Sequence, residues 1–177
     1  MPLGSDYARQ DCGIARSLEL VGERWTLLIL RDAFFGVRRF SDFLTHLDIS
    51  RGVLTARLDA LVAEGLLRRV GDGHSEYELT DDALGLWPVL RSLAAWGDRR
   101  TGTGRPRRLF RHLDCGDLDR DGRCTTCGAM PTPADLEVRP GPGADLTVRD
   151  DPISQALRHP HRLLEPLRPG ARQSTSS

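Results

Sequence analysis

The apolar residues in the first part of the chain recur at helical spacing. Residues 12–22 are compatible with one helix, with Asp11 as the N-cap and Gly22 directly after its end. Residues 23–36 are apolar on almost every side, which is typical of a buried central helix, and Gly36 marks its expected end. The pattern therefore predicts two consecutive helices, the second at the centre of the core.

Two further helices are expected between residues 37 and 65, joined by the short link LDIS. The first starts at Ser41 and turns inward the apolar side chains of Phe40, Phe43, Leu44 and Leu47. The second has Ser50 as its N-cap and Gly65 as its C-cap. One face of this second helix is apolar, through Leu54, Leu58, Leu61 and Val62.

A β-hairpin and a last helix follow. The runs LLRRV and EYELT alternate in polarity, and the Gly-Asp-Gly between them is a hairpin turn signal. Thr80, Asp81 and Asp82 then combine an N-cap with acidic residues in the first turn of a helix that continues to about Arg100. Pro88 either kinks this helix or resets its start.

The order of these elements predicts the fold class. Two short helices with a tight link, followed by a hairpin, make a winged helix-turn-helix in a mostly α chain with one small β-hairpin. After about Gly102 the chain becomes Arg-rich, then Cys-rich, then rich in Pro and Gly. We expect an N-terminal arm at 1–11, a winged DNA-binding domain at 12–104, a small zinc-knuckle-like appendage at 105–145, and a partly disordered tail at 146–177.

The outer face of the helix after Ser50 consists of short or acidic residues, namely Gly52, Ala56, Asp59 and Ala63. Small side chains let a large partner approach the backbone closely, as DNA does around the recognition helix in its major groove. Arg57, on the flank, could reach DNA or pair with an acid of its own domain. The candidate DNA-binding residues are Arg38, Arg39, Ser50, Arg51, Gly52, Thr55, Arg57, Arg68, Arg69 and His74.

Composition changes this picture little. The chain is 39% hydrophobic and 28% charged, as in soluble globular proteins, and its formal net charge is zero. All 25 basic residues are Arg, which genomic base composition explains more simply than selection for DNA binding. No apolar run approaches the roughly 18 residues that span a bilayer, and no secretory signal is evident. We therefore expect a cytoplasmic protein without a membrane partner.

The spacing of cysteines and one histidine predicts a metal site. His112 and Cys115, like Cys124 and Cys127, are separated by two residues, so a tight turn can present each pair to one ion. Four protein ligands leave no open position, so we expect one structural Zn²⁺ per chain. If His112 is not a ligand, water, His159 or His161 completes the shell. No catalytic motif is present, and we expect that the protein is not an enzyme.

Three segments carry a family resemblance: VGERWTLLILRD, RRFSDFLTHLDISRGVLTARLDALVAEGLLRR and YELTDDALGLWPVLRSLAAWGD. They resemble the HxlR-type winged helix-turn-helix transcriptional regulators, from about Cys12 to Arg100. The resemblance implies a homodimer on a near-palindromic operator, joined through the first and last helices of the domain. The chain departs from the family pattern at Gly13, where Pro is usual, and at Ala83, where Gly is usual.

The resemblance also bears on Cys12, since the first Cys is a redox sensor in some members. Cys12 lies near a helix N-terminus, which lowers a thiol pKa, but a small buried residue at the dimer interface is the simpler interpretation. A small effector could bind between subunits near Trp25, Trp87 and Trp96, although three Trp are more often core residues.

The sequence thus predicts a homodimeric, sequence-specific DNA-binding transcriptional regulator. The alternatives are a zinc-stabilised protein-interaction module and a redox-sensing regulator that uses Cys12. Salt dependence distinguishes DNA from a protein partner, because contacts between Arg and phosphate weaken steeply with salt and apolar contacts do not.

Overall fold

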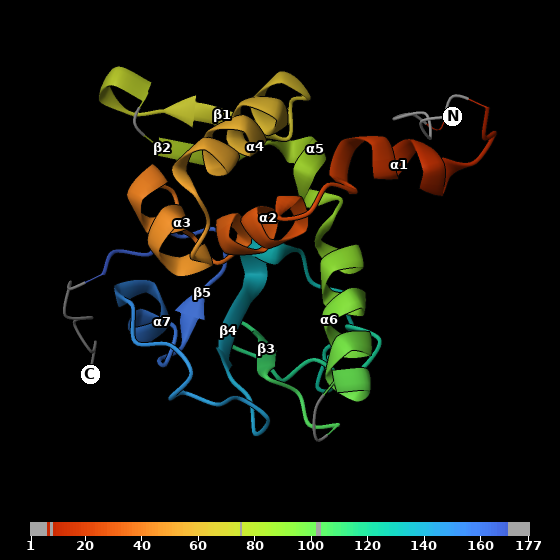
Figure 1. Cartoon of the computed structure of the whole chain (residues 1–177). Helices are drawn as coiled ribbons and strands as arrows, with labels where there is room; N and C mark the ends of the chain where they lie inside the picture. The colour runs from red at the N-terminus through yellow and green to blue at the C-terminus, as the bar shows by residue number, and fades with distance from the viewer. Residues whose placement is uncertain (1–6, 8, 75, 102–103, 170–177) are drawn as a thin grey trace.

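The computed structural model describes residues 7, 9–74, 76–101 and 104–169 (Figure 1). The helical part contains α1 (Gly13–Val21), α2 (Thr26–Phe34), α3 (Phe40–Leu47), α4 (Arg51–Ala63), α5 (Asp81–Leu84) and α6 (Trp87–Thr101). Its hairpin consists of β1 (Leu67–Val70) and β2 (Glu76–Leu79), with a short 3-10 turn at Asp72–His74. The C-terminal part contains β3 (Arg108–His112), a 3-10 turn at Pro133–Asp135, β4 (Leu136–Pro140), α7 (Pro152–Ala156) and β5 (His161–Arg162).

The helix boundaries follow local capping. Ser50 Oγ accepts a hydrogen bond from the Val53 N–H at the start of α4, and Thr80 Oγ1 accepts one from the Ala83 N–H at the start of α5. Pro88 is the second residue of α6, so it resets the helix start and leaves α5 as a separate turn. The mostly helical fold with a small hairpin is confirmed.

Several predicted boundaries are wrong by one or two residues. The N-cap of α1 is Cys12 rather than Asp11, α3 begins at Phe40 rather than Ser41, and Glu64 rather than Gly65 is the C-cap of α4. The central helix α2 ends at Phe34, two residues before Gly36. Such shifts arise because several neighbouring residues can satisfy the free backbone groups at a helix end.

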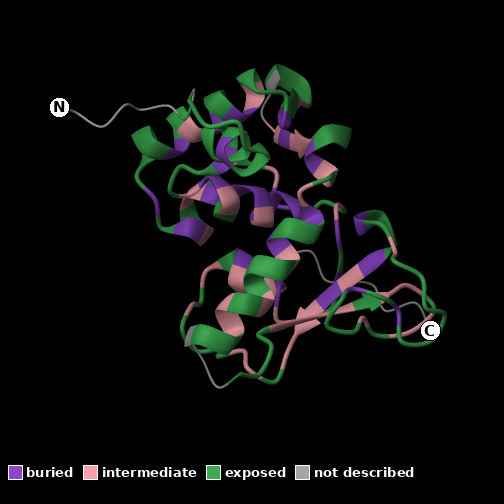
Figure 2. Ribbon diagram, turned by 90° about the vertical axis from the view of Figure 1, so that its right-hand side faces the viewer, coloured by how far each residue is buried: buried purple, intermediate pink, exposed green. Residues whose placement is uncertain are grey.

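Helix α2 is the centre of the core. Ile29, Leu30 and Phe34 are fully buried, and Trp87 packs on Phe34 with ring centroids 5.3 Å apart. On its other side Trp87 meets Phe110 of β3 edge to face at 4.9 Å. The core therefore continues from the helices into the C-terminal sheet, as the buried positions in Figure 2 show.

The hairpin and the C-terminal sheet are both antiparallel. In the hairpin, Leu67 pairs with Leu79 and Val70 with Glu76, and Figure 1 places this wing beside α4. The C-terminal sheet has the order β3-β4-β5. The sequence indicates the hairpin but none of these three strands.

The C-terminal segment packs into the common core. Four apolar residues beyond residue 150 are buried with the helical core, namely Ile153, Leu157, Leu163 and Leu167. Backbone bonds from the Leu164 N–H to Phe34 O and from the Leu167 N–H to Gly36 O attach the segment to the end of α2. Gly36 has φ +87°, and a Cβ there would collide with the Glu165 carbonyl oxygen, so this close approach requires glycine. Within the described residues, no helix is long and apolar enough to span a bilayer.

Candidate nucleic-acid interface and metal centre

The outer face of α4 is open. The start of the helix is exposed from Ser50 to Val53, and the region where a Gly52 side chain would stand is empty to 4 Å. Thr55 and Ala56 are also exposed, whereas Leu54 and Leu58 on the opposite face are fully buried. No described part of the chain covers this face, so the short side chains leave the α4 backbone accessible to a large partner.

Of the two arginines in α4, Arg51 is the more exposed. Its guanidinium stacks over the Phe40 ring at 5.3 Å, and no carboxylate among the described residues pairs with it. Thr55, one turn later, donates its hydroxyl hydrogen to the Arg51 carbonyl at 2.9 Å. The first turn of α4 therefore presents an unpaired cation beside a hydroxyl group that can still accept a hydrogen bond.

The other candidate cations are paired with acids. Arg68 pairs with Glu78 at 2.9 Å, and Arg69 pairs with Asp59 while lying over the Tyr77 ring. Arg57 pairs with Glu23 at 3.3 Å, so the structure shows the partner within the domain that the sequence left open. The side chain of His74 lies outside the described residues. These exposed pairs are weak, and phosphate groups could replace the acids.

Arg38 and Arg39 differ in their accessibility. Arg38 is half-buried, pairs with Glu78 and donates to the Leu164 carbonyl, so it ties the hairpin to the C-terminal segment. Arg39 is exposed and pairs with Glu76 at 3.3 Å. Arg39, with 63% of its side chain exposed, is therefore more accessible than Arg38, with 23%.

The structure brings together the four predicted metal ligands. One ligand atom from each of His112, Cys115, Cys124 and Cys127 lies within 4.8 Å of all the others. The Cys115 and Cys124 sulfurs are 3.4 Å apart, and Cys127 Sγ is 3.5 Å from His112 Nδ1. Around a tetrahedral zinc, two sulfurs would be about 3.8 Å apart and a sulfur and a nitrogen about 3.6 Å apart. The donor set and spacing therefore fit Zn²⁺.

The loop of the second ligand pair favours the thiolate form. Backbone N–H groups of Cys127 and Thr126 point at the buried Cys124 sulfur and, with His112 and Cys115, lower its pKa to about 5, while the contact with Cys124 raises the pKa of the Cys115 thiol to about 11. Gly116 follows the first pair, and a Cβ there would collide with the Thr126 side chain. His161, an alternative fourth ligand, is buried elsewhere against the Glu165 carbonyl.

The sequence did not indicate how the candidate metal-binding loop, residues 113–131, docks on the rest of the chain. Arg91 of α6 donates to the Arg120 carbonyl at 2.8 Å, and its guanidinium fits against Gly122. Arg139 of β4 pairs with Asp117 at 2.7 Å. The loop between the ligand pairs is thus attached to the last helix of the winged part and to the C-terminal sheet.

Cys12 is exposed at the N-cap of α1. Backbone N–H groups of Ala15 and Ile14 point at its sulfur and lower the pKa of the thiol.

Among the tryptophans, Trp87 is a core residue, Trp25 is half-buried and Trp96 is exposed. The core interpretation of the three tryptophans is confirmed for Trp87, holds in part for Trp25, which packs against the core, and is wrong for Trp96.

Comparison with known proteins agrees with this geometry. Residues 20–104 match the family model described as HxlR-like helix-turn-helix. An uncharacterized HTH-type transcriptional regulator of Mycobacterium tuberculosis is 45% identical over 137 residues, which cover 73% of this chain and 86% of the relative. Residues 1–104 make up a smaller share of the chain than the 73% that is matched, so the similarity extends into the C-terminal part.

Further relatives match mainly over shorter stretches. The uncharacterized HTH-type transcriptional regulator YdeP of Bacillus subtilis is 29% identical over 105 residues, covering 55% of this chain and 82% of the relative. A solved structure of a candidate transcription factor of Pseudomonas aeruginosa is 47% identical, covers 52% of this chain and 64% of that chain, and has a TM-score of 0.40.

Proposed function

The chain belongs to the HxlR-like helix-turn-helix family of transcriptional regulators, and we propose that it binds a double-stranded DNA operator as a homodimer. The observation that carries this proposal is the open face of α4, with small residues outside and Arg51 in its first turn, which pairs with none of the described carboxylates. A major groove about 12 Å wide accepts such a helix, and the first-turn residues meet base edges. The role requires that the protein share a compartment with DNA, as the cytoplasmic location expected from the sequence would provide.

We assign contacts with base edges and contacts with phosphates to different residues. Ser50, Arg51 and Thr55 lie in the first turns of α4, where they would reach base edges or the nearest phosphates. Arg39, Arg68 and Arg69 are exposed around the wing and would exchange their carboxylate partners for phosphates. Arg57 is accessible on the flank, and Gly52 lets the backbone approach closely.

The salt dependence of binding tests this function. We expect the logarithm of the association constant for DNA from upstream of the gene to fall linearly with the logarithm of salt concentration. Each neutralised phosphate contributes about −0.9 to the slope, so a few Arg contacts give a slope of several units. Fluorescence anisotropy with labelled duplexes measures it. An association constant that barely changes with salt would instead favour the protein-interaction module.

The proposed homodimer has an apolar surface on each of two helices. On α6, Val89, Leu93 and Trp96 are exposed at helical spacing, with 53% of Trp96 accessible. On α1, Ile14 is 72% exposed and Leu18 lies one turn further along. Figure 1 shows α1 projecting from the body on the side along which α6 runs. A second copy of the chain would bury these surfaces.

Replacing Leu93 by glutamate is expected to convert the dimer to a monomer, because the interface would then bury an unpaired carboxylate. The matched control is Ala94→Glu, which adds the same charge at an exposed position of α6 that lies about 100° around the helix from Leu93 and off the stripe of Val89, Leu93 and Trp96. Sedimentation equilibrium measures the mass. A monomeric wild-type protein, or equal masses for the two variants, would contradict this interface.

We propose that His112, Cys115, Cys124 and Cys127 hold one structural Zn²⁺ per chain. The support is their convergence to within 4.8 Å and the lowered pKa of Cys124. The loop from residue 113 to 131 has few buried side chains, so bound zinc would supply much of its stability. Four protein ligands leave no open coordination position, which fits a regulator rather than a metalloenzyme.

A redox role for Cys12 is the second candidate, favoured by its exposure and by the backbone N–H groups at its sulfur. We expect Cys12 to react with iodoacetamide at a lower pH in the folded, zinc-loaded protein than in the denatured chain, since unfolding removes these donors. Mass spectrometry of peptides across a pH series gives both midpoints. Equal midpoints would leave Cys12 without an activated thiol.

A further inference from the structure

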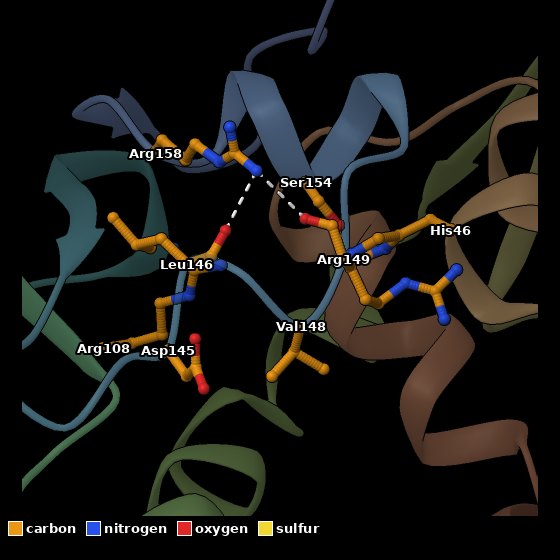
Figure 3. Close-up of a pocket in the computed structure, with 8 residues that line it drawn as sticks. All are labelled: His46, Arg108, Asp145, Leu146, Val148, Arg149, Ser154 and Arg158. Carbon is orange, nitrogen blue, oxygen red and sulfur yellow. Dashed lines mark hydrogen bonds between the residues drawn. The ribbon is translucent and has the colours of Figure 1, made fainter.

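A cationic cavity of about 190 Å³ lies where the C-terminal segment meets the helix-turn-helix (Figure 3). Its walls come from α3 through His46, from β3 through Arg108, from the segment before α7 through Arg149, and from the segment after α7 through Arg158. In liquid water each molecule occupies about 30 Å³, so the cavity has room for roughly six waters or a small organic molecule.

Arg108 is the residue that points to an anion. It is half-buried, and its only described partners are the Leu157 carbonyl at 2.6 Å and the Phe35 ring. Burial, together with the nearby charge of Arg31, lowers the pKa of its guanidinium. None of the described carboxylates forms an ion pair with Arg108, and a partly buried cation in that position is stabilised by an anionic ligand.

The other two arginines are held in place around the cavity. Arg149 donates to the Thr45 carbonyl at 2.9 Å and to Asp151 at 3.0 Å. Arg158 donates to the carbonyls of Leu146 and Arg149, and these two bonds are dashed in Figure 3. Its Nε is buried and has no hydrogen-bond partner among the described residues. The cations are therefore positioned before any ligand arrives.

The neighbouring acids are partly satisfied by other donors. Asp151 also accepts hydrogen bonds from the backbone N–H groups of Ile153 and Ser154 at the start of α7. Asp145, which lines the cavity, accepts from both the N–H and the hydroxyl of Thr147. Asp150 pairs with Arg158 but is mostly exposed. The fully buried carboxylate of Asp32 also acts on Arg108 through its charge and partly opposes the lowering of the guanidinium pKa, but its oxygens are bound by Arg31 and by His46 Nδ1, each at 2.7 Å.

Two apolar residues complete the wall. Leu146 is 42% exposed and Val148 is 73% exposed, so both offer free apolar surface next to the arginines. We propose that this cavity binds a small organic carboxylate, with its charged group at Arg108 and its carbon skeleton against Leu146 and Val148. Planar guanidinium groups match the geometry of a carboxylate.

The location suggests what such binding would do. Thr45 and His46 belong to the last turn of α3, and the helix that follows is α4. A ligand in the cavity would contact both α3 and the C-terminal segment. It would therefore shift the equilibrium between relative positions of α3 and α4. This effector role rests on the proposed DNA-binding function, whereas the binding itself does not.

The test uses benzoate as the probe and isothermal titration in a low-salt buffer without DNA. Wild type should bind benzoate saturably, with a dissociation constant of about 1 mM or below. Val148→Glu, at an exposed position on the wall, should weaken binding about tenfold by repulsion, and its neutral isostere Val148→Gln should not. Arg108→Gln should weaken binding as well.

Three results would overturn the proposal: no saturable binding, equal affinities for the two Val148 variants, or inorganic phosphate binding as tightly as benzoate. The last would assign the cavity to an inorganic anion. Circular dichroism checks that each variant is folded. Because DNA is absent from the titration, failure here leaves the DNA-binding proposal standing, and loss of DNA binding leaves this one standing.

Discussion

Replacing Cys124 by serine is expected to abolish zinc binding and to lower the melting temperature by roughly 10 °C or more. Cys124 is the one buried member of the four candidate ligands, and its sulfur lies 3.4 Å from that of Cys115. The free energy of zinc binding is also folding free energy for a small loop-rich unit. A loss of about 3–5 kcal/mol corresponds to such a shift, because 1 kcal/mol moves the midpoint by roughly 2–4 °C in a chain of this size.

Elemental analysis of protein purified without added zinc, combined with calorimetry, measures both effects. The matched control is Cys12→Ser, which also removes one thiol, but at an exposed position away from the four ligands, and should keep one zinc per chain. Less than half an equivalent of zinc in the wild type, or an unchanged melting temperature for Cys124→Ser, would refute the metal centre.

The winged part should stay folded when the metal is lost. Its core is formed by α2 and the residues packed around it, whereas the candidate metal-binding loop touches this core with the partly buried Leu118 and is otherwise held by polar contacts of Arg91 and Arg139 and by the backbone bond from Leu118 N–H to Phe110 O. The far-ultraviolet circular dichroism signal of the helices should therefore persist in Cys124→Ser at low temperature.

The second large effect is expected for Arg51→Ala, which should lower the affinity for the specific operator by about tenfold or more. Arg51 is exposed in the first turn of α4, and within the described residues its guanidinium contacts the Phe40 ring and no carboxylate, so its removal costs the fold little. A bidentate contact between arginine and a base contributes roughly 1–3 kcal/mol of discrimination. Electrophoretic mobility shifts with specific and scrambled duplexes measure the change.

The control for general charge is Arg162→Ala, which removes one exposed arginine from β5. It should reduce affinity for specific and scrambled DNA alike, and only slightly. If Arg51→Ala and Arg162→Ala had the same effect on the specific duplex, α4 would not be the reading helix.

The winged part was predictable because its signals are local. Ser50 and Thr80 cap their helices through residues three positions later, and a Gly-Asp-Gly turn joins two adjacent strands. The cluster of four candidate metal ligands was predictable for the same reason, since each pair lies on one short turn. Ligands that are close in the sequence need no long-range information.

The C-terminal sheet was not predictable because its pairings are distant. Strand β3 pairs with β4 across the whole metal-binding loop, and β5 has only two residues. Leu163 and Leu167 have spacing typical of a helix, yet they follow a strand and pack beside α2. Such segments take their structure from the surface that they cover, and not from their own periodicity.

The same reason explains what was missed at the sites. Arg108, Arg149 and Arg158 come from three segments, so nothing in the sequence indicates that they share one cavity. The pairing of Arg38 with Glu78 likewise depends on the hairpin register and on the Leu164 carbonyl. The sequence shows where the arginines are, but it does not show which acidic residues pair with them in the folded chain.

The central claim is that α4 of a homodimer reads a specific DNA sequence, and selection of genomic fragments by the purified protein tests it most directly. The expected result is enrichment of a few fragments that share an inverted repeat, with half-site centres separated by about one helical turn of DNA or a whole multiple of it. Recovery of fragments in the same proportions as in the input, with no shared repeat, would contradict the account.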